Sequence, residues 1–154
     1  MLTGEKTVRR ADVMEDTGAS ISPNVDIGQV EGAFVMGLGL WLSEELRFNP
    51  TSGRLLTRDS WEYKPPASQD IPEVFNTYLY NSNDNPFGVL GSKATGEPPL
   101  LMAMSAFLAL RDAITDCRVS LGMERKDWFQ FDGPGTNERV IASSGITSDY
   151  FKLY

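Results

Sequence analysis

The sequence predicts an α+β fold in which mixed strands accompany two long buried helices, as part of a larger domain. Residues 6–16 alternate β-favouring and charged side chains, which is typical of a half-buried strand. Residues 22–46 and 99–117 carry apolar side chains at helical spacing, and the second stretch is apolar nearly all round. Because the first strand begins close to residue 1 and must pair with another strand, we expect a fragment of a larger domain.

Composition limits the chemistry that this chain can perform. It has 154 residues, enough for one domain, and a net charge of −7 that disfavours nucleic acid and anionic membrane surfaces as partners. It has no histidine and one cysteine, Cys117, which excludes imidazole-activated nucleophiles and protein-ligated transition metals. No apolar run approaches the roughly 20 residues of a membrane span and no signal-peptide pattern is present, so we expect a soluble, cytoplasmic chain.

The first helix is predicted from its start signal and its apolar stripe. Ser22 can cap free N–H groups, and Pro23 suits the first helical position because it has no N–H to satisfy. Val30, Phe34 and Leu38 then recur at steps of four, as on a helix face that packs on a core. We expect this helix to end near residue 46.

Four glycines inside this helix need an explanation, because each costs up to about 1 kcal/mol relative to alanine. They are Gly28, Gly32, Gly37 and Gly39. Gly28 and Gly32 lie one turn apart, so either another element packs closely against them or a bulky cofactor occupies the space. The pattern alone favours close packing.

The middle and the end of the chain are predicted to hold shorter elements. Three further strands are expected, at residues 45–48, 55–63 and 74–80. A turn at residues 49–53 would join the first two of them. A Gly-Pro-Gly sequence at residues 133–135 breaks regular structure before a short helix near residues 137–142.

The most informative local sequence is Gly96-Glu97-Pro98-Pro99. A residue that precedes proline avoids the α region, so we expect the helix to begin at Pro99, with Glu97 on an extended stem before it. Glu97 could then cap the free N–H groups of the first turn, which is a common use of glutamate near a helix start. The alternative is a general base at the edge of a pocket, with Gly96 leaving room for a ligand.

Four segments in this order resemble the molybdenum hydroxylases, the family of aldehyde oxidases and xanthine dehydrogenases. They are residues 28–39 (GQVEGAFVMGLG), 63–66 (YKPP), 70–72 (DIP) and 92–100 (SKATGEPPL). The resemblance is to the end of the molybdopterin-binding domain. It implies that residues 1–130 are the C-terminal part of that domain and that residues 131–154 are a C-terminal tail.

The resemblance also implies cofactors and roles for individual residues. The family's molybdenum is held by the dithiolene of its molybdopterin and by non-protein ligands, so no protein metal ligand is expected here. Glu97 matches the family's general base, which takes the proton from the Mo–OH group. Gln29 matches the glutamine beside the molybdenum cofactor, and Gly28 and Gly96 would border that cofactor. FAD and 2Fe–2S clusters would lie upstream of this chain, and the intact protein would be a homodimer.

Three interpretations of the function remain open. Lys64-Pro65-Pro66 and Thr95 favour a segment of an aldehyde oxidase, which oxidises aldehydes, and some N-heterocycles, with oxygen derived from water. A xanthine dehydrogenase segment that acts on purines is the alternative within the family. A truncated, non-catalytic fragment is the third interpretation. Because Gln29 and Glu97 are the expected cofactor contacts that this chain contains, we expect the chain alone to be inactive.

Overall fold

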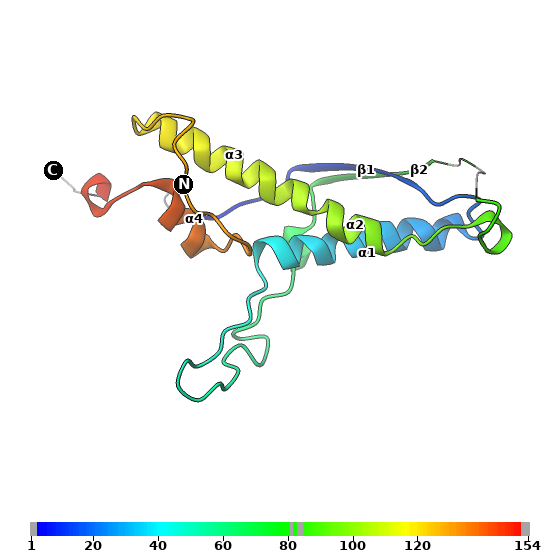
Figure 1. The fold of residues 1–154 in the computed structure, drawn as a ribbon, viewed down its shortest axis with the longest axis horizontal. Coiled ribbons are helices and arrows are strands. Elements are labelled where there is room, and N and C mark those ends of the chain that lie inside the picture. Colours follow the sequence, from blue (N-terminus) through cyan, green and yellow to red (C-terminus); the bar gives the residue numbers. More distant parts are fainter. Residues whose placement is uncertain (1–2, 81, 83–84, 152–154) are drawn as a thin grey trace.

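The computed structural model describes residues 3–80, 82 and 85–151, and a long helix, α1 (Pro23–Leu42), lies at its centre (Figure 1). A small sheet consists of β1 (Arg10–Asp16) and β2 (Val74–Tyr80). The later helices are α2 (Glu97–Met102), α3 (Met104–Ser120) and α4 (Asn137–Ser144). Short 3-10 turns occupy Ser68–Asp70, Val89–Gly91 and Ser148–Phe151. The predicted α+β class is confirmed.

The two strands pair in parallel along their full length, in a register that places Glu15 opposite Leu79. Both predicted strands are confirmed, although β1 begins at Arg10 and not at residue 6. Ala11, Val13 and Glu15 of β1 are buried, whereas the residues between them are exposed. This alternation shows that the sheet covers the core with one face.

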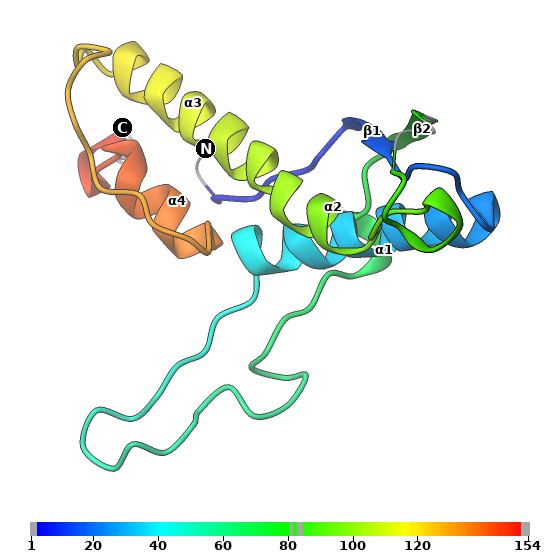
Figure 2. The same cartoon turned by 45° about the vertical axis from the view of Figure 1, so that its right-hand side comes forward.

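The two strands predicted on either side of the turn at residues 49–53 are wrong. Residues 43–66 form a long excursion whose two ends contact the helices and whose middle stands away from the helices and the sheet, as Figure 2 shows for the cyan-to-green segment. Strand pairing in this excursion is limited to one antiparallel bridge, between Phe48 and Leu55, although the turn itself forms. A two-stranded hairpin with no packed layer beside it is marginal, so the pairing does not extend.

The core lies between α1, the sheet and α3. Val30, Phe34 and Leu38 of α1 are at most 4% exposed, which confirms the predicted apolar stripe. The ring of Phe34 lies 5.3 Å from that of Phe75 in β2, and Phe107 of α3 belongs to the same buried cluster. Burial of large side chains such as these contributes about 1.5–3 kcal/mol each, and it fixes α1 between the sheet and α3.

Helix α1 differs from its prediction at both ends. It stops at Leu42, and Ser22 occupies the N-cap position with extended backbone but makes no capping hydrogen bond through its side chain to the described residues. Among the described helices, α1 is long and apolar enough to cross a membrane by length and composition. The core helix of a globular domain meets the same criterion, and the stripe that begins at Val30 packs in the core.

The apolar segment after Gly96 is not the single buried helix that was predicted. It divides at Ala103 into α2 and α3, and both helices keep an open apolar face on which Leu101 is 65% exposed and Leu108 is 49% exposed. Phe107 and Ile114 are buried on the opposite face. Since α1 and its neighbours cover one face, a helix that is apolar all round leaves its other face uncovered in this chain.

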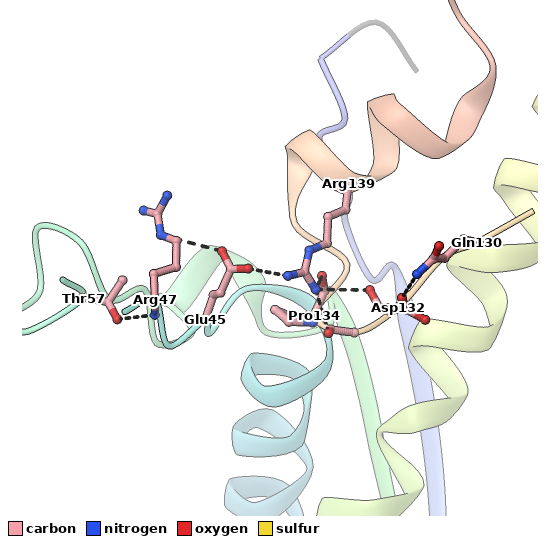
Figure 3. A network of polar contacts seen from close by, with 8 residues as sticks. Glu45, Arg47, Thr57, Gln130, Asp132, Pro134 and Arg139 are labelled. Carbon is pink, nitrogen blue, oxygen red and sulfur yellow. Dashed lines mark hydrogen bonds and ion pairs between the residues drawn. The ribbon is translucent and has the colours of Figure 1, made fainter. Parts of the chain in front are cut away.

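The C-terminal segment is tied to the end of α1 by the polar network in Figure 3. Arg139 of α4 forms an ion pair with Glu45 and donates a hydrogen bond of 2.7 Å to the carbonyl of Gly133. Phe131 and Val140 are buried in the common core. The helix predicted near residues 137–142 is confirmed, and the first part of the predicted C-terminal tail packs against the core.

Candidate functional site

The residues predicted to form the site converge where α2 begins beside the first half of α1. A Cβ placed on Gly96 would lie 3.3 Å from Oε1 of Gln29, so the Gln29 side chain reaches the backbone at Gly96. Glu97 follows as the first residue of α2, and its side chain is exposed. The fold thus brings Gln29, Gly96 and Glu97 to one surface, although the helices that carry them are distant in sequence.

Close packing between α1 and α2 sets this geometry. A Cβ on Gly37 would lie 2.4 Å from the carbonyl oxygen of Leu100 and 2.5 Å from Cβ of Ala103. Ala103 itself is fully buried. Only a residue without a Cβ allows the two backbones to approach so closely, and this contact holds the first turn of α2 against α1.

The start of α2 corrects the prediction for Glu97. The backbone of Gly96 is already helical, with φ −79° and ψ −30°, and Glu97 is inside the helix, not on an extended stem before it. Pro98 and Pro99 occupy the first turn, where an N–H has no partner within the helix and its loss costs nothing. The good fit of both prolines to the first helical turn outweighs the preference of a residue before proline for extended backbone.

The capping role favoured for Glu97 is not what the structure shows. The first turn of α2 receives no side-chain cap, and Glu97 makes no hydrogen bond within the described residues. The two prolines also remove N–H groups that a cap would satisfy. The Glu97 carboxyl is therefore an exposed acceptor on a rigid helix start, as a general base would need to be.

Gly28 and Gly32 form an open stripe on α1 beside this surface. A Cβ on either residue would meet no heavy atom within 4 Å among the described residues. The close packing predicted for this pair is therefore wrong for this chain. The close approach occurs one or two turns later, at Gly37 and at Gly39, where a Cβ would lie 2.6 Å from Cδ of Pro66. The open stripe leaves room for a ligand to lie against the α1 backbone.

The segment that leads into Gly96 is anchored to the end of β1. The Lys93 ammonium donates to Asp16 at 2.6 Å, and the Lys93 N–H donates to the carbonyl of Thr17 at 3.0 Å. The hydrogen bond from Lys93, together with those from Gly18 and Ser82, lowers the pKa of Asp16 to about 2. This ion pair fixes the approach to α2, so the position of Glu97 is determined from both sides.

Glu15 is the residue near the site that sequence reasoning missed. Its side chain is 6% exposed, and neither carboxyl oxygen has a hydrogen-bond partner among the described residues. Burial, and then the charges of Asp26 and Glu97, raise the pKa of Glu15 to about 7. The alternation of β1 already contained the signal, because Glu15 continues the buried series of Ala11 and Val13.

Asp26, unlike Glu15 and Glu97, has hydrogen-bond partners within the described residues. It accepts hydrogen bonds from the hydroxyls of Ser20 and Thr95, at 2.5 and 3.4 Å. Thr95 is 9% exposed, so its hydroxyl faces Asp26 and not the surface of the site.

No group of three or more potential metal ligands is found in the parts of the chain that the structure describes. Gln29 and Glu97, by contrast with Thr95, are exposed, so the amide and the carboxyl are open to a ligand.

Comparison with known proteins relates the sequence to one kind of domain. A family model described as the molybdopterin cofactor-binding domain matches residues 1–72. Xanthine dehydrogenase/oxidase of Rattus norvegicus is 46% identical over 139 residues, which cover 90% of this chain and 10% of that protein. Xanthine dehydrogenase 1 of Arabidopsis thaliana is 41% identical over 163 residues, covering 97% of this chain and 12% of that protein. The chain thus spans about a tenth of the length of these relatives.

Solved structures show the same fold. The reconstituted CO dehydrogenase from Oligotropha carboxidovorans superposes with a TM-score of 0.74 at 22% identity, over 92% of this chain and 16% of that one. Quinoline 2-oxidoreductase from Pseudomonas putida 86 gives a TM-score of 0.62 at 27% identity, over 85% of this chain and 15% of that one. The arrangement of the sheet and helices is therefore one that larger oxidoreductases contain as a segment.

Proposed function

We propose that this chain, which belongs to the molybdenum hydroxylase family, forms one wall of the molybdopterin site in a longer oxidoreductase. The observation that carries the proposal is the meeting of Gln29, Gly96 and Glu97 at the start of α2, beside the open stripe of Gly28 and Gly32. Three separate sequence features thus contribute to one surface. The relatives named above support membership of the family. The oxidoreductase activity of the intact protein is our proposal.

The described residues fit a large polar cofactor at this surface. With no Cβ at Gly28 and Gly32, and no described atom beyond the local backbone of α1 within 4 Å of where a Cβ would lie, a planar group can lie against α1. The exposed amide of Gln29 offers both a donor and an acceptor to such a group. Gly96 keeps the approach to Gln29 free of a side chain. Molybdopterin, when bound, would supply the two-electron oxidation that these side chains cannot perform.

Glu97 would act as the general base. Its carboxyl is exposed, makes no hydrogen bond within the described residues and begins a helix whose first turn contains two prolines. An oxygen of Glu97 can therefore accept the proton of the hydroxyl that is transferred to the substrate. The packing of Gly37 against Leu100 holds α2 in place, so that little reorientation is needed at the moment of proton transfer.

We propose a nitrogen heterocycle of the purine class as the substrate, with an aldehyde as the second candidate. The relatives named above are xanthine dehydrogenases, which supports a purine. The features that favoured an aldehyde oxidase do not reach the site surface, because Thr95 is buried against Asp26 and Pro66 packs on Gly39. An aldehyde remains the second candidate on the strength of the Lys64-Pro65-Pro66 sequence.

The remaining features of the intact protein are also proposals. FAD and 2Fe–2S clusters would carry the electrons away in the part of the protein that this chain does not include. The intact protein would be a cytoplasmic homodimer. The net charge of −7 in this segment disfavours nucleic acid and anionic membrane surfaces as partners.

The test is Glu97→Gln in the intact protein that contains this segment, with turnover of xanthine and of an aldehyde normalised to bound molybdenum. Loss of a general base costs typically 10² to 10⁴ in rate, roughly 3–5 kcal/mol of barrier. We expect that loss with molybdenum retained, for whichever substrate the parent oxidises. Turnover within tenfold of the parent would remove Glu97 from the mechanism.

A further inference from the structure

β1 carries a glutamate where its alternation calls for an apolar side chain. Glu15 is 6% exposed, and both of its carboxyl oxygens lack a hydrogen-bond partner among the described residues. Two residues later, Thr17 is 1% exposed, and its hydroxyl oxygen is likewise unpartnered in the described part of the chain. Buried polar groups nearly always have a hydrogen-bond partner. Two that lack one, only two residues apart on β1 and just after it, indicate a place with a specific use.

The charges that act on Glu15 from the packed helices are negative. α1 contributes Asp26 and α2 contributes Glu97. β2 places the apolar Leu79 opposite Glu15, so the neighbouring strand adds no charge at that pairing. Further along α1, the Glu31 carboxyl faces β2 at the Thr77 hydroxyl, 3.3 Å away.

The cation at this end of the sheet is already engaged. Lys93 pairs with Asp16 at 2.6 Å, and Glu15 forms no ion pair with any described residue. A carboxylate that is desolvated and faces other carboxylates is unfavourable, whereas the protonated acid is not. Burial and the two neighbouring charges accordingly raise the pKa of Glu15 to about 7. Glu97, by contrast, is exposed to water.

We propose that Glu15 is a positioning residue of this site, because its buried and unpartnered carboxyl keeps its proton and so places a neutral group, and not a further negative charge, near Glu97. Protonated Glu15 adds no negative charge beside Glu97, the residue that accepts the proton of the reaction in the proposed function. The role of Glu97 rests on the proposed function, whereas the proton on Glu15 does not.

The proton can be observed directly in the chain. Carbon-13 labelling of glutamate carboxyls allows each one to be titrated by NMR, and the signal that disappears in Glu15→Gln identifies Glu15. We expect its midpoint near pH 7, and we expect Glu97→Gln to lower that midpoint because one negative neighbour is removed. Glu73→Gln is the matched control, since Glu73 is exposed at the opposite end of the sheet and should leave the midpoint unchanged.

A midpoint below about pH 5, or equal shifts in Glu97→Gln and Glu73→Gln, would overturn the proposal. In the intact protein, ionisation of Glu15 beside Glu97 should produce an inflection of kcat/KM near pH 7, and Glu15→Gln should abolish that inflection because glutamine stays neutral. An inflection near pH 7 that persists in Glu15→Gln, in a protein that Glu97→Gln inactivates, would refute the positioning role alone. Full activity of Glu97→Gln, with the NMR coupling present, would instead refute the proposed function and leave the proton on Glu15 standing.

Discussion

Replacement of Gly37 by alanine should destabilise the chain, whereas the same replacement at Gly32 should stabilise it. Both glycines lie inside α1, so both variants gain the helix propensity of alanine, worth up to about 1 kcal/mol. At Gly32 the new methyl group would meet nothing within 4 Å in the described structure. At Gly37 it would lie 2.4 Å from the Leu100 oxygen and 2.5 Å from Cβ of Ala103.

The clash at Gly37 outweighs the gain in propensity. Leu100 offers a backbone atom and Ala103 is fully buried, so neither can turn aside as the end of a flexible side chain would. Overpacking of this kind costs typically 1–3 kcal/mol. At its upper end, this leaves Gly37→Ala about 2 kcal/mol less stable than the parent. Gly32→Ala should be up to about 1 kcal/mol more stable, so the two variants differ by about 3 kcal/mol.

Urea denaturation of the purified chain, followed by far-ultraviolet circular dichroism, measures this difference. For a domain of this size, 3 kcal/mol corresponds to a separation of roughly 6–12 °C in Tm, which thermal melts would also detect. Equal stability of the two variants, or a stabilised Gly37→Ala, would show that α1 and α2 do not approach as described. The contact between Gly37 and Leu100 would then not hold Glu97 in place.

Three further predictions follow from the same structure. Glu15→Gln should gain stability relative to the parent as the pH rises from about 4.5 to about 7, by up to about 3 kcal/mol, because the unfolded carboxyl ionises in that range while the folded one keeps its proton; parallel stability curves from pH 4 to 8 would contradict this. Gln29→Ala in the intact protein should lower molybdenum content or turnover without a lower Tm, because Gln29 is exposed and outside the apolar stripe; full metal content with unchanged kinetics would show an ordinary surface amide. The isolated chain, produced in a host that makes molybdopterin, should retain no molybdenum, and stoichiometric metal by elemental analysis would refute the view that it forms only one wall of the site.

Local pattern was sufficient for the elements that a single stretch of sequence determines. The alternation before Asp16 and at residues 74–80 predicted both strands, and the apolar stripe of Val30 and Phe34 predicted the buried face of α1. Such periodicity states which face of an element is buried, because side-chain direction repeats with the backbone. Gln29 and Glu97 were predicted as site residues from the resemblance to the molybdenum hydroxylases and, for Glu97, from the Gly-Glu-Pro-Pro sequence, although their proximity could not be derived from spacing.

Everything that depends on a partner element was decided by the tertiary structure. The glycine that permits close packing is Gly37 and not Gly28, because only Gly37 faces α2. Glu97 lies inside α2, although a residue before proline prefers extended backbone. The two prolines that follow it fit the first turn of a helix, and this fit outweighs that preference. Glu15 became a buried acid when α1 and α2 brought Asp26 and Glu97 toward it. The sequence by itself determines which face of each element is apolar and must be buried. Which element buries that face depends on residues distant in sequence, so only the folded chain decides it.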